Sequence, residues 1–425
     1  MTSRRAHLML LVSTTGYTGE AFGEAARALG VPTIVGSDRC HVLSEQWPLQ
    51  GMVTLDFRHP EQAVRQIREV SRRAEMEIAA IVPTSEVTAR IAALASDELG
   101  LRHNPPEAAE AAGNKRIMRE RLEKAGVPAP RARIFPVDGD PASLADGIAF
   151  PCVLKPLLLS ASRGVIRADD RESFVAAFRR IAALLDAPEL LELHPTDSKQ
   201  ILVEPFVEGP EVAVEGLLGP PVAGAPSPFR MLAVFDKPDP LEGPFFEETI
   251  YVTPSRLPAP TRSEIARVTA AAARALGLCD GPVHAELRVS PRGVQVIEIA
   301  ARTIGGLCSR TLRFGAGTSL EELVIRHAMS LPLENIERQN HAAGVMMIPI
   351  PRAGILTGID GIEEAKSIAG IEDVVITAAE RRLVPLPEGK AYLGFIFARG
   401  DTPAFVEDAL RRAHAKLDLH ITPTL

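Results

Sequence analysis

Apolar residues follow two different spacings in the N-terminal part of the chain. Continuous apolar runs, typical of strands buried on both faces of a parallel sheet, occur at residues 7–12, 32–35 and 78–82. Apolar residues at helical spacing predict helices that end near residue 29 and span about 61–75 and 86–99. Because strands and helices alternate, we predict a parallel α/β layer that ends at Asn104-Pro105-Pro106.

The rest of the chain mixes short strands with helices. A helix is predicted over about residues 114–124, where a Gly followed by prolines gives a common helix ending. Further strands are predicted at 132–135, 152–155 and 201–206, with a helix around 172–185. Beyond residue 341 the pattern favours strands and then a helix at about 402–417, which predicts a small α+β unit.

Composition excludes several classes of protein without naming a function. The chain has 425 residues, a formal net charge of −7 and 4% aromatic residues, so neither a basic field nor base-stacking side chains favour nucleic acid. The longest uncharged stretch, residues 216–229, is rich in Pro and Gly and is no membrane span. Four cysteines without a C-x-x-C pair indicate neither a zinc site nor a disulfide framework, and we predict a reduced, cytoplasmic setting.

Two strands near residue 290 carry the strongest candidate chemistry. Residues 282–289 (PVHAELRV) and 293–301 (GVQVIEIAA) predict a β-hairpin with one acid in each strand, Glu286 and Glu298. Carboxylates among apolar residues are costly unless they are paired or bind a metal, and two facing acids suit Mg²⁺. For the two acids to lie on the same face of the hairpin, the loop between the strands must contain three or five residues, because a loop of two residues would put the acids on opposite faces. Taken alone, two solvent-facing glutamates are an equally good interpretation.

The residues around this hairpin favour a site. Arg302 offers a planar fork to a carboxylate or phosphate, and Gly305-Gly306 let a ligand approach the backbone. His284, on the first strand, can orient a substrate or carry a proton; a histidine satisfied within the protein is the alternative.

A lysine at the end of an apolar strand is the second feature. Lys155 ends the strand at 152–155, where packing gives no reason for a lysine. The loop after it can close its N–H groups over phosphates, and it contains Ser160, Ser162, Arg163 and Gly164. The G-x-x-x-x-G-K-[ST] spacing of a P-loop is absent, and a surface lysine beside a flexible turn is the alternative.

Residues 203–211 (VEPFVEGPE) form the third feature. A strand that breaks at Pro205 leaves backbone N–H and C=O groups free to form hydrogen bonds with the edge of an adenine ring. Glu211 can accept hydrogen bonds from ribose hydroxyls. Glutamates beside Pro and Gly are equally common in solvated turns. Nearer the N-terminus, Gly16, Gly19 and Gly23 lack the G-x-G-x-x-G spacing, so we interpret them as a βα turn, not a dinucleotide fingerprint.

In this order, the three features resemble the ATP-grasp superfamily of carboxylate–amine ligases over about residues 8–330. The resemblance implies an α/β and α+β ATP-grasp fold: an N-terminal parallel α/β domain (1–113), a small lobe or lid with its leading helix (114–205), a large lobe (206–340) and a C-terminal α+β domain (341–425). It implies ATP with Mg²⁺, or Mn²⁺ as the alternative metal, held by Glu286 and Glu298. The implied nucleotide contacts are Lys115, Lys155, Ser160, Ser162, Arg163, Gly164, Glu204, Phe206, Val207 and Glu211.

Two motif forms are similar to those of L-amino-acid ligases, which join amino acids into dipeptides. They are E-x-A-A-R at residues 298–302 and H-x-E-L at residues 284–287. The usual superfamily pattern has Asn where this chain has Ala300, which leaves the number of metal ions open. The resemblance implies catalytic roles for Arg302 and His284, a substrate ammonium near Glu248 and a roomy acyl pocket. The substrate residues that it implies are Glu248, Arg302, Gly305, Gly306 and Arg310.

The activity implied is an ADP-forming ligation of a small carboxylate to an amine, both amino acids, through an acyl phosphate. Its partners would be small molecules, with neither nucleic acid nor membrane; homodimers are common among such ligases. Three rival interpretations stay open at this point. They are a purine-pathway or carboxylase-like enzyme that uses formate or bicarbonate, a nucleotide-binding regulator without turnover and, more distantly, a dinucleotide oxidoreductase.

Overall fold

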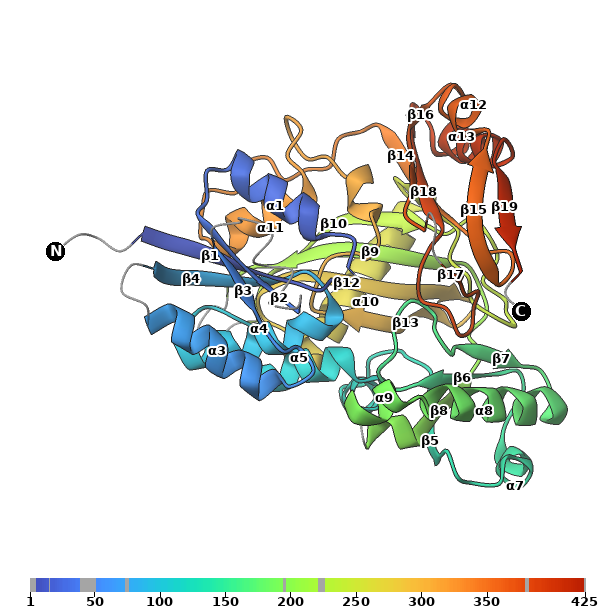
Figure 1. Cartoon of the computed structure of the whole chain (residues 1–425). Coiled ribbons are helices and arrows are strands. Elements are labelled where there is room, and N and C mark those ends of the chain that lie inside the picture. The colour runs from blue at the N-terminus through green and yellow to red at the C-terminus, as the bar shows by residue number, and fades with distance from the viewer. Residues whose placement is uncertain are drawn as a thin grey trace.

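The computed structural model of the chain describes residues 5–14, 16–38, 51–72, 76–193, 196–220, 226–378 and 382–423. Within these residues the strands form four β-sheets (Figure 1). The predicted fold class, mixed α/β and α+β, is confirmed. Cys40 lies outside the described residues. None of the helices in the ranges above is long and apolar enough to cross a membrane.

The N-terminal layer is a parallel sheet with the strand order β3-β2-β1-β4. Its strands are β1 (Arg5–Val12), β2 (Thr33–Ser37), β3 (Met52–Thr54) and β4 (Met76–Pro83). The helices around it are α1 (Gly19–Ala28), α3 (Pro60–Arg72), α4 (Glu86–Leu99), α5 (Pro106–Gly113) and, from later in the chain, α11 (Leu320–Ala328). Met9 and Leu11 pack toward α3 and α4, whereas Leu8 and Leu10 pack toward α1 and α11. This two-sided burial explains the continuous apolar run.

The small lobe is an antiparallel sheet with the order β5-β8-β6-β7. It consists of β5 (Arg133–Pro136), β6 (Cys152–Pro156), β7 (Ile166–Ala168) and β8 (Gln200–Pro205), with the short segments α7 (Pro141–Leu144), η1 (Ala145–Gly147), α9 (Pro188–Leu193) and η2 (Asp197–Lys199). Helix α8 (Arg171–Leu185) supplies Phe174, Phe178 and Ile181 to its core. The leading helix α6 (Lys115–Lys124) begins where the Asn114 side chain accepts from the N–H groups of the first turn.

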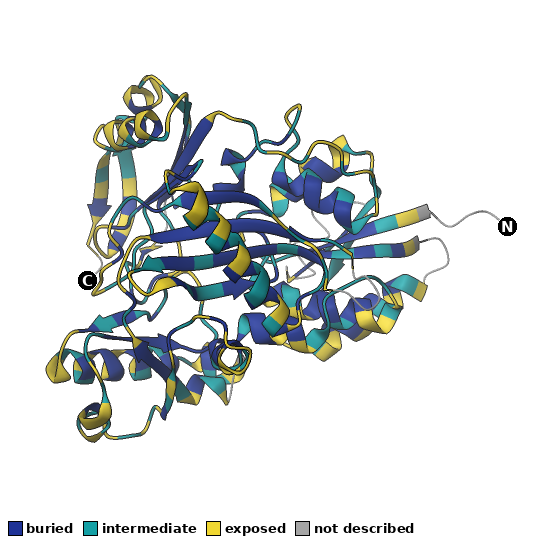
Figure 2. Ribbon diagram, turned by 180° about the vertical axis from the view of Figure 1, so that it is seen from behind, coloured by how far each residue is buried: buried dark blue, intermediate teal, exposed yellow. Residues whose placement is uncertain are grey.

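The large sheet has eight antiparallel strands in the order β13-β12-β9-β10-β11-β14-β18-β16. They are β9 (Glu211–Leu218), β10 (Phe229–Asp236), β11 (Ile250–Thr253), β12 (Gly281–Ser290), β13 (Gly293–Ala300), β14 (Ala342–Ile348), β16 (Ile371–Ile376) and β18 (Gly394–Gly400). Helix α10 (Ala259–Leu276) buries Ile265, Val268 and Ala272 against β9, β12 and β13, and Figure 2 shows it crossing these buried strands. On the opposite face lie the short helix η3 (Cys308–Thr311) and α11.

The C-terminal segment divides between two sheets. Strands β14, β18 and β16 extend the large sheet, so the predicted boundary at 340/341 falls between strands of one sheet. The remaining strands, β15 (Gly354–Asp360), β17 (Arg382–Leu383) and β19 (Asp418–Thr422), form a separate small sheet. Helices α12 (Ile362–Lys366) and α13 (Pro403–His414) complete the segment, and Val406, Leu410 and Ala413 of α13 are buried.

Candidate active site

One large cavity lies where the N-terminal layer, the small lobe, the large sheet and the C-terminal segment meet. Its volume is about 260 Å³. Tyr17 and Glu86 reach it from the N-terminal layer, Lys155 from the small lobe and Tyr392 from the C-terminal segment. The predicted site residues that line it are Lys115, Lys155, Ser160, Ser162, Glu204, Phe206, Val207, Glu211, Glu248, His284, Glu286, Glu298, Arg302, Gly305 and Gly306.

Three predicted site residues, Arg163, Gly164 and Arg310, are not part of this lining. Arg163 donates from Nε to the backbone carbonyl of Glu388 (3.0 Å), and Gly164 beside it also contacts the C-terminal segment through its N–H. Arg310 forms an ion pair with Asp373 (3.0 Å) away from the cavity. In the structure these three residues contact other parts of the protein, and their phosphate and substrate contacts stay predictions.

The hairpin of β12 and β13 places Glu286 directly opposite Glu298. The predicted loop of three or five residues is wrong, because the loop contains two residues, 291–292. A β-bulge at Ile297 supplies the missing register step, since one extra residue on β13 brings the two acids back to the same face. Arg119 of α6 donates from Nη2 to the carbonyl of Ile297 (2.7 Å), so a distant side chain satisfies the backbone at the bulge.

Lys115 connects the start of α6 to both this hairpin and the loop after β6. Its Nζ lies 3.4 Å from Glu298 Oε2 and donates to the carbonyl of Leu159 at 2.8 Å. The lysine is buried, and a buried ammonium needs such partners. Because an ammonium has three N–H donors, one remains for a ligand in the cavity.

Lys155 and Glu204 form a buried ion pair between neighbouring strands of the small lobe. Lys155 Nζ lies 2.6 Å from Glu204 Oε1, and Arg119 Nε binds Glu204 Oε2 at 2.9 Å. Burial opposes the charge on Glu204, but the two cations outweigh it and lower the pKa of this carboxyl. Glu204 is therefore a permanent anchor that fixes the lysine and joins the small lobe to α6.

The segment after β8 has fewer free backbone groups than the sequence predicts. Phe206 donates its N–H to the carbonyl of Pro151 (3.0 Å), and the Val207 carbonyl accepts from Arg288 Nη1 (2.7 Å). The rings of Phe206 and Phe246 stack with centroids 6.3 Å apart. The same Phe206 ring lies 4.8 Å from the Arg288 guanidinium. The wall here is aromatic and cationic as well as polar.

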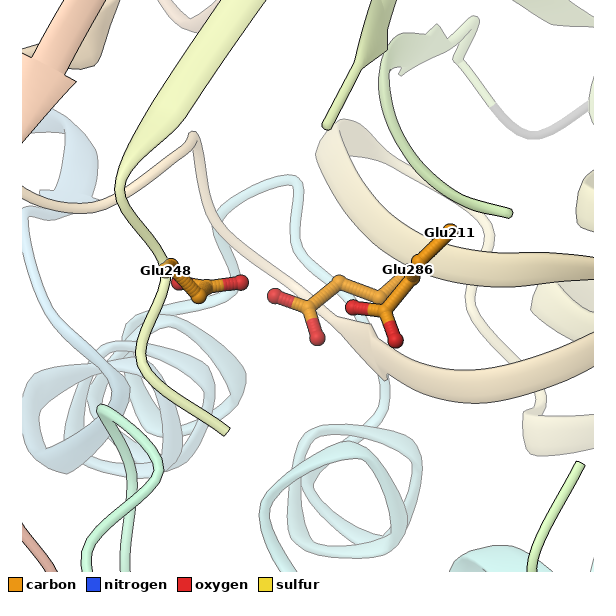
Figure 3. A group of neighbouring side chains, drawn as sticks. All are labelled: Glu211, Glu248 and Glu286. Carbon is orange, nitrogen blue, oxygen red and sulfur yellow. The ribbon is translucent and has the colours of Figure 1, made fainter. Parts of the chain in front are cut away.

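Three carboxylates surround the ammonium of Lys237. Glu211 Oε1 lies 2.7 Å from Lys237 Nζ, Glu248 also forms an ion pair with it, and Glu286 Oε1 lies at 3.5 Å. Figure 3 shows the three acids pointing toward one another. One carboxylate oxygen of each acid lies within 4.8 Å of an oxygen of each of the other two. The other oxygen of Glu211 binds Arg288 Nε at 2.9 Å, so both of its oxygens have partners before any ribose approaches.

The cluster around Lys237 holds its charges unequally. Burial alone would lower the pKa of Lys237, but the three carboxylates raise it well above the ordinary value. The pKa of Glu248 is raised to about 6. Burial and the nearby negative charge of Glu286 raise it, and the positive charge of Lys237 lowers it by less. For Glu286 burial is outweighed by Lys237 and His284, and the pKa is lowered. Glu286 is consequently more firmly ionised than Glu248.

His284 sits between two carboxylates on neighbouring strands. Its Nδ1 lies 2.5 Å from Glu215, and its Nε2 lies 3.7 Å from Glu286. Burial opposes the charge, but the hydrogen bond with Glu215 and the attraction of Glu286 raise the pKa of His284 to about 9. The imidazolium therefore keeps its proton at neutral pH and fixes Glu286 in place.

We expect the ligand-free protein to lose stability between about pH 6.5 and 9, in part through His284. Its folded pKa of about 9 lies above the ordinary 6.5, so protonation stabilises the fold fully below pH 6.5 and ceases to do so as the pH passes 9. The contribution is at most about 3 kcal/mol. Urea unfolding midpoints at the two pH values measure it. A His284→Gln variant should lose less stability over this interval than the wild type, and equal losses would contradict the assignment.

Arg302 follows β13 and is held by an acid from the N-terminal layer. Its Nη2 lies 2.9 Å from Glu86 Oε2, at the start of α4, and its Nη1 donates to the Thr303 carbonyl at 2.9 Å. Although burial opposes it, Glu86 raises the pKa of this guanidinium. The remaining N–H groups of the fork are free to bind a planar anion.

Sequence reasoning missed several residues of this wall. Glu86, Arg288 and Lys390 line the cavity, Glu215 is buried against His284, and none of the four was singled out. Their positions depend on contacts between segments 69 to 216 residues apart, such as Glu215 with His284 and Glu86 with Arg302. For Arg288 and Glu215 a signal existed, because both are charged residues inside apolar strands.

Comparison with protein families finds two matches along the chain. Residues 148–311 match the ATP-grasp domain, and residues 346–422 match the L-amino acid ligase C-terminal domain 2. The first covers most of the small lobe and the cavity-lining part of the large sheet. The second covers the segment that carries β14 to β19.

Relatives of known activity are ligases. The chain is 28% identical over 284 residues to the alanine–anticapsin ligase of Bacillus subtilis, an alignment that covers 64% of this chain and 58% of that protein. It is 29% identical over 232 residues to the D-alanine–D-alanine ligase of Methylibium petroleiphilum, with 51% and 66% covered. Each alignment thus spans less than two thirds of the relative.

A solved structure matches the whole fold. The crystal structure of an L-amino acid ligase from Bacillus licheniformis superposes with a TM-score of 0.83 and 26% identity. The superposition covers 99% of this chain and 100% of that one. All four parts of the fold, including the C-terminal segment, therefore have a counterpart in a single chain.

Proposed function

We propose, on the premise that this chain is an ATP-grasp ligase with an L-amino acid ligase C-terminal domain, that it joins two amino acids through an acyl phosphate. The products would be a dipeptide, ADP and phosphate. The observation that carries the proposal is that one cavity is lined both by the opposed acids Glu286 and Glu298 and by Arg302, whose remaining N–H groups can bind a planar anion. The residues proposed for phosphate transfer and the residue proposed for carboxylate binding thus line the same cavity.

The nucleotide end is supported by cations and oxygen ligands. Lys115 and Lys155 line the cavity, and each keeps at least one N–H donor for a phosphate oxygen. Glu286 and Glu298 share one face of the hairpin and line the cavity, so their carboxylates fit the oxygen preference of Mg²⁺. When bound there, the metal supplies charge neutralisation to the phosphates of ATP.

The two chemical steps require orientation more than a nucleophile from the protein. In the first, a substrate carboxylate oxygen bonds to the γ-phosphorus of ATP and ADP leaves. In the second, the amine nitrogen bonds to the acyl carbon, phosphate leaves and the nitrogen loses a proton. We assign to Arg302 the task of holding the carboxylate in line with the phosphate.

The intermediate must be kept from water, and the small lobe is placed to do this. Ser160 and Ser162, in the loop after β6, line the cavity opposite the large sheet. A closing movement of this lobe would expel water from the acyl phosphate. The amine substrate would lie near Glu248, whose carboxylate lines the same cavity and can accept from an ammonium.

The test is a screen of amino acid pairs for phosphate release, with mass detection of the condensed product. Phosphate and ADP should appear when two amino acids are present, and a product heavier than either should accompany them. Formation of AMP and pyrophosphate would overturn the mechanism. Turnover with formate or bicarbonate in place of an amino acid would instead favour a purine-pathway or carboxylase-like activity, and ATP binding without any turnover a regulator.

The setting of the reaction is also a proposal. Cys152, Cys279 and Cys308 are free thiols, which together with the need for ATP supports the cytoplasm as the compartment. Homodimer formation is proposed from the resemblance to such ligases, and light scattering of the purified protein measures it directly.

A further inference from the structure

We propose that Lys390 binds the carboxylate of the amino acid that supplies the amine. This inference rests on the proposed function, because it deepens the description of the second substrate site. An amino acid acceptor brings one group that reacts, its amine, and one that must not, its carboxylate. Because Arg302 is assigned to the carboxylate that is phosphorylated, the carboxylate of the acceptor needs another cation, and a cation without a carboxylate partner in the protein offers it the most charge.

The basic side chains around the cavity differ in this respect. Four of them have carboxylate partners: Lys115 with Glu298 at 3.4 Å, Lys155 with Glu204 at 2.6 Å, Arg288 with Glu211 at 2.9 Å and Arg302 with Glu86 at 2.9 Å. Lys390 also lines the cavity, and it forms no ion pair with any residue that the structure describes. Its charge is therefore available to a ligand.

The neighbours of Lys390 fit a zwitterion. A smaller cavity adjoins the main one, and both are lined by Lys390 together with Ser162, Phe246, Glu248 and Tyr392. Lys237 and Tyr251 both donate to Oε1 of Glu248, which leaves Oε2 of this carboxylate to accept from a ligand, and Lys390 supplies a positive charge at the same junction. An amino acid would present its ammonium to Glu248 and its carboxylate to Lys390.

The backbone around Lys390 is fixed by the small lobe. Gly164 donates its N–H to the carbonyl of Pro387 (2.8 Å), and Arg180 of α8 binds Glu388 through two hydrogen bonds of 2.6 and 2.9 Å. Just before the lysine, Gly389 allows a tight turn, because a Cβ there would lie 1.8 Å from the Val384 carbonyl oxygen. The C-terminal segment thus delivers the lysine to the cavity beside the lobe that carries the phosphate loop.

The experiment compares an acceptor amino acid with its amide, which lacks the carboxylate. L-Alanine and L-alaninamide are the first pair, followed by whichever amino acid the screen selects. With Lys390→Met we expect KM for the amino acid to rise about 10- to 100-fold and KM for the amide to stay unchanged. Lys390→Arg, which keeps the charge, should recover most of the loss. Lys416→Met, an exposed lysine of the same segment, is the matched control.

Two other measurements distinguish binding of the acceptor carboxylate by Lys390 from binding of phosphate by the same residue. KM for ATP should be unchanged in Lys390→Met; a rise in KM for ATP with equal loss for amino acid and amide would overturn the proposal and assign the lysine to phosphate. Hydroxylamine, which traps an acyl phosphate without an acceptor, should give the same hydroxamate yield in variant and wild type. Absence of hydroxamate in the wild type with every carboxylate tested would instead reject the proposed function itself.

Discussion

Replacing Glu298 by glutamine is expected to lower kcat by at least about 1,000-fold. The amide keeps the size of the side chain but removes the negative charge that faces Glu286 across the hairpin and Lys115 at 3.4 Å. Two carboxylates on one face can hold a divalent cation, whereas one carboxylate and one amide hold it far less well. The loss should be partly recovered at high Mg²⁺ concentration, because the defect is in binding the ion. Steady-state ADP release over a Mg²⁺ titration measures both effects.

A matched glutamate on the surface gives the control for this variant. Glu264→Gln, on the exposed side of α10, removes the same charge from the same protein and should leave kcat within about twofold of wild type. Because Glu286 and Glu298 act together, the double variant should be little worse than either single one. Normal turnover by Glu298→Gln, at low as well as high Mg²⁺, would refute the assignment of this residue to the metal.

Elements whose burial shows in the order of apolar and polar residues along the chain were predictable from the sequence. Residues 7–12 are continuously apolar because β1 is covered on both faces, and that pattern alone predicted a strand of a parallel layer. Lys155 and the glutamates of the hairpin stood out because charge inside an apolar strand demands a reason. Helix α5 was missed, since a short Ala-rich helix after two prolines looks like a boundary.

What the sequence could not predict depends on contacts between distant segments. The register of the hairpin requires a bulge at Ile297, and a side chain from α6, Arg119, satisfies the carbonyl there. The same arginine binds Glu204, an implied nucleotide contact, and makes it an anchor between α6 and the small lobe. The large sheet continues across the boundary predicted at residues 340/341, because the order of strands in a sheet is not encoded in the local pattern.

Arg302 is expected to be the second most sensitive position, with a fall in kcat/KM of about 100- to 1,000-fold for Arg302→Met. The guanidinium is held by Glu86 and by the Thr303 carbonyl, so its remaining N–H groups have a fixed direction before substrate binds. Arg302→Lys keeps the charge but loses the planar fork, and most of the activity should still be lost. An exposed arginine at the tip of the same hairpin, Arg292, gives the control as Arg292→Met.

Hydroxylamine trapping tells which step Arg302 serves. If the arginine holds the carboxylate that is phosphorylated, hydroxamate formation and dipeptide formation should fall by the same factor. If it holds the acceptor instead, hydroxamate formation should survive while dipeptide formation falls, and the assignment to the first step would be wrong.

Glu86→Gln is expected to have a smaller effect than Arg302→Met, because it leaves the guanidinium in the cavity but removes the carboxylate that orients it. For this variant we expect a loss of about tenfold, with a larger change in kcat than in KM. A guanidinium that has lost its orientation still attracts the substrate carboxylate but places it out of line with the phosphate.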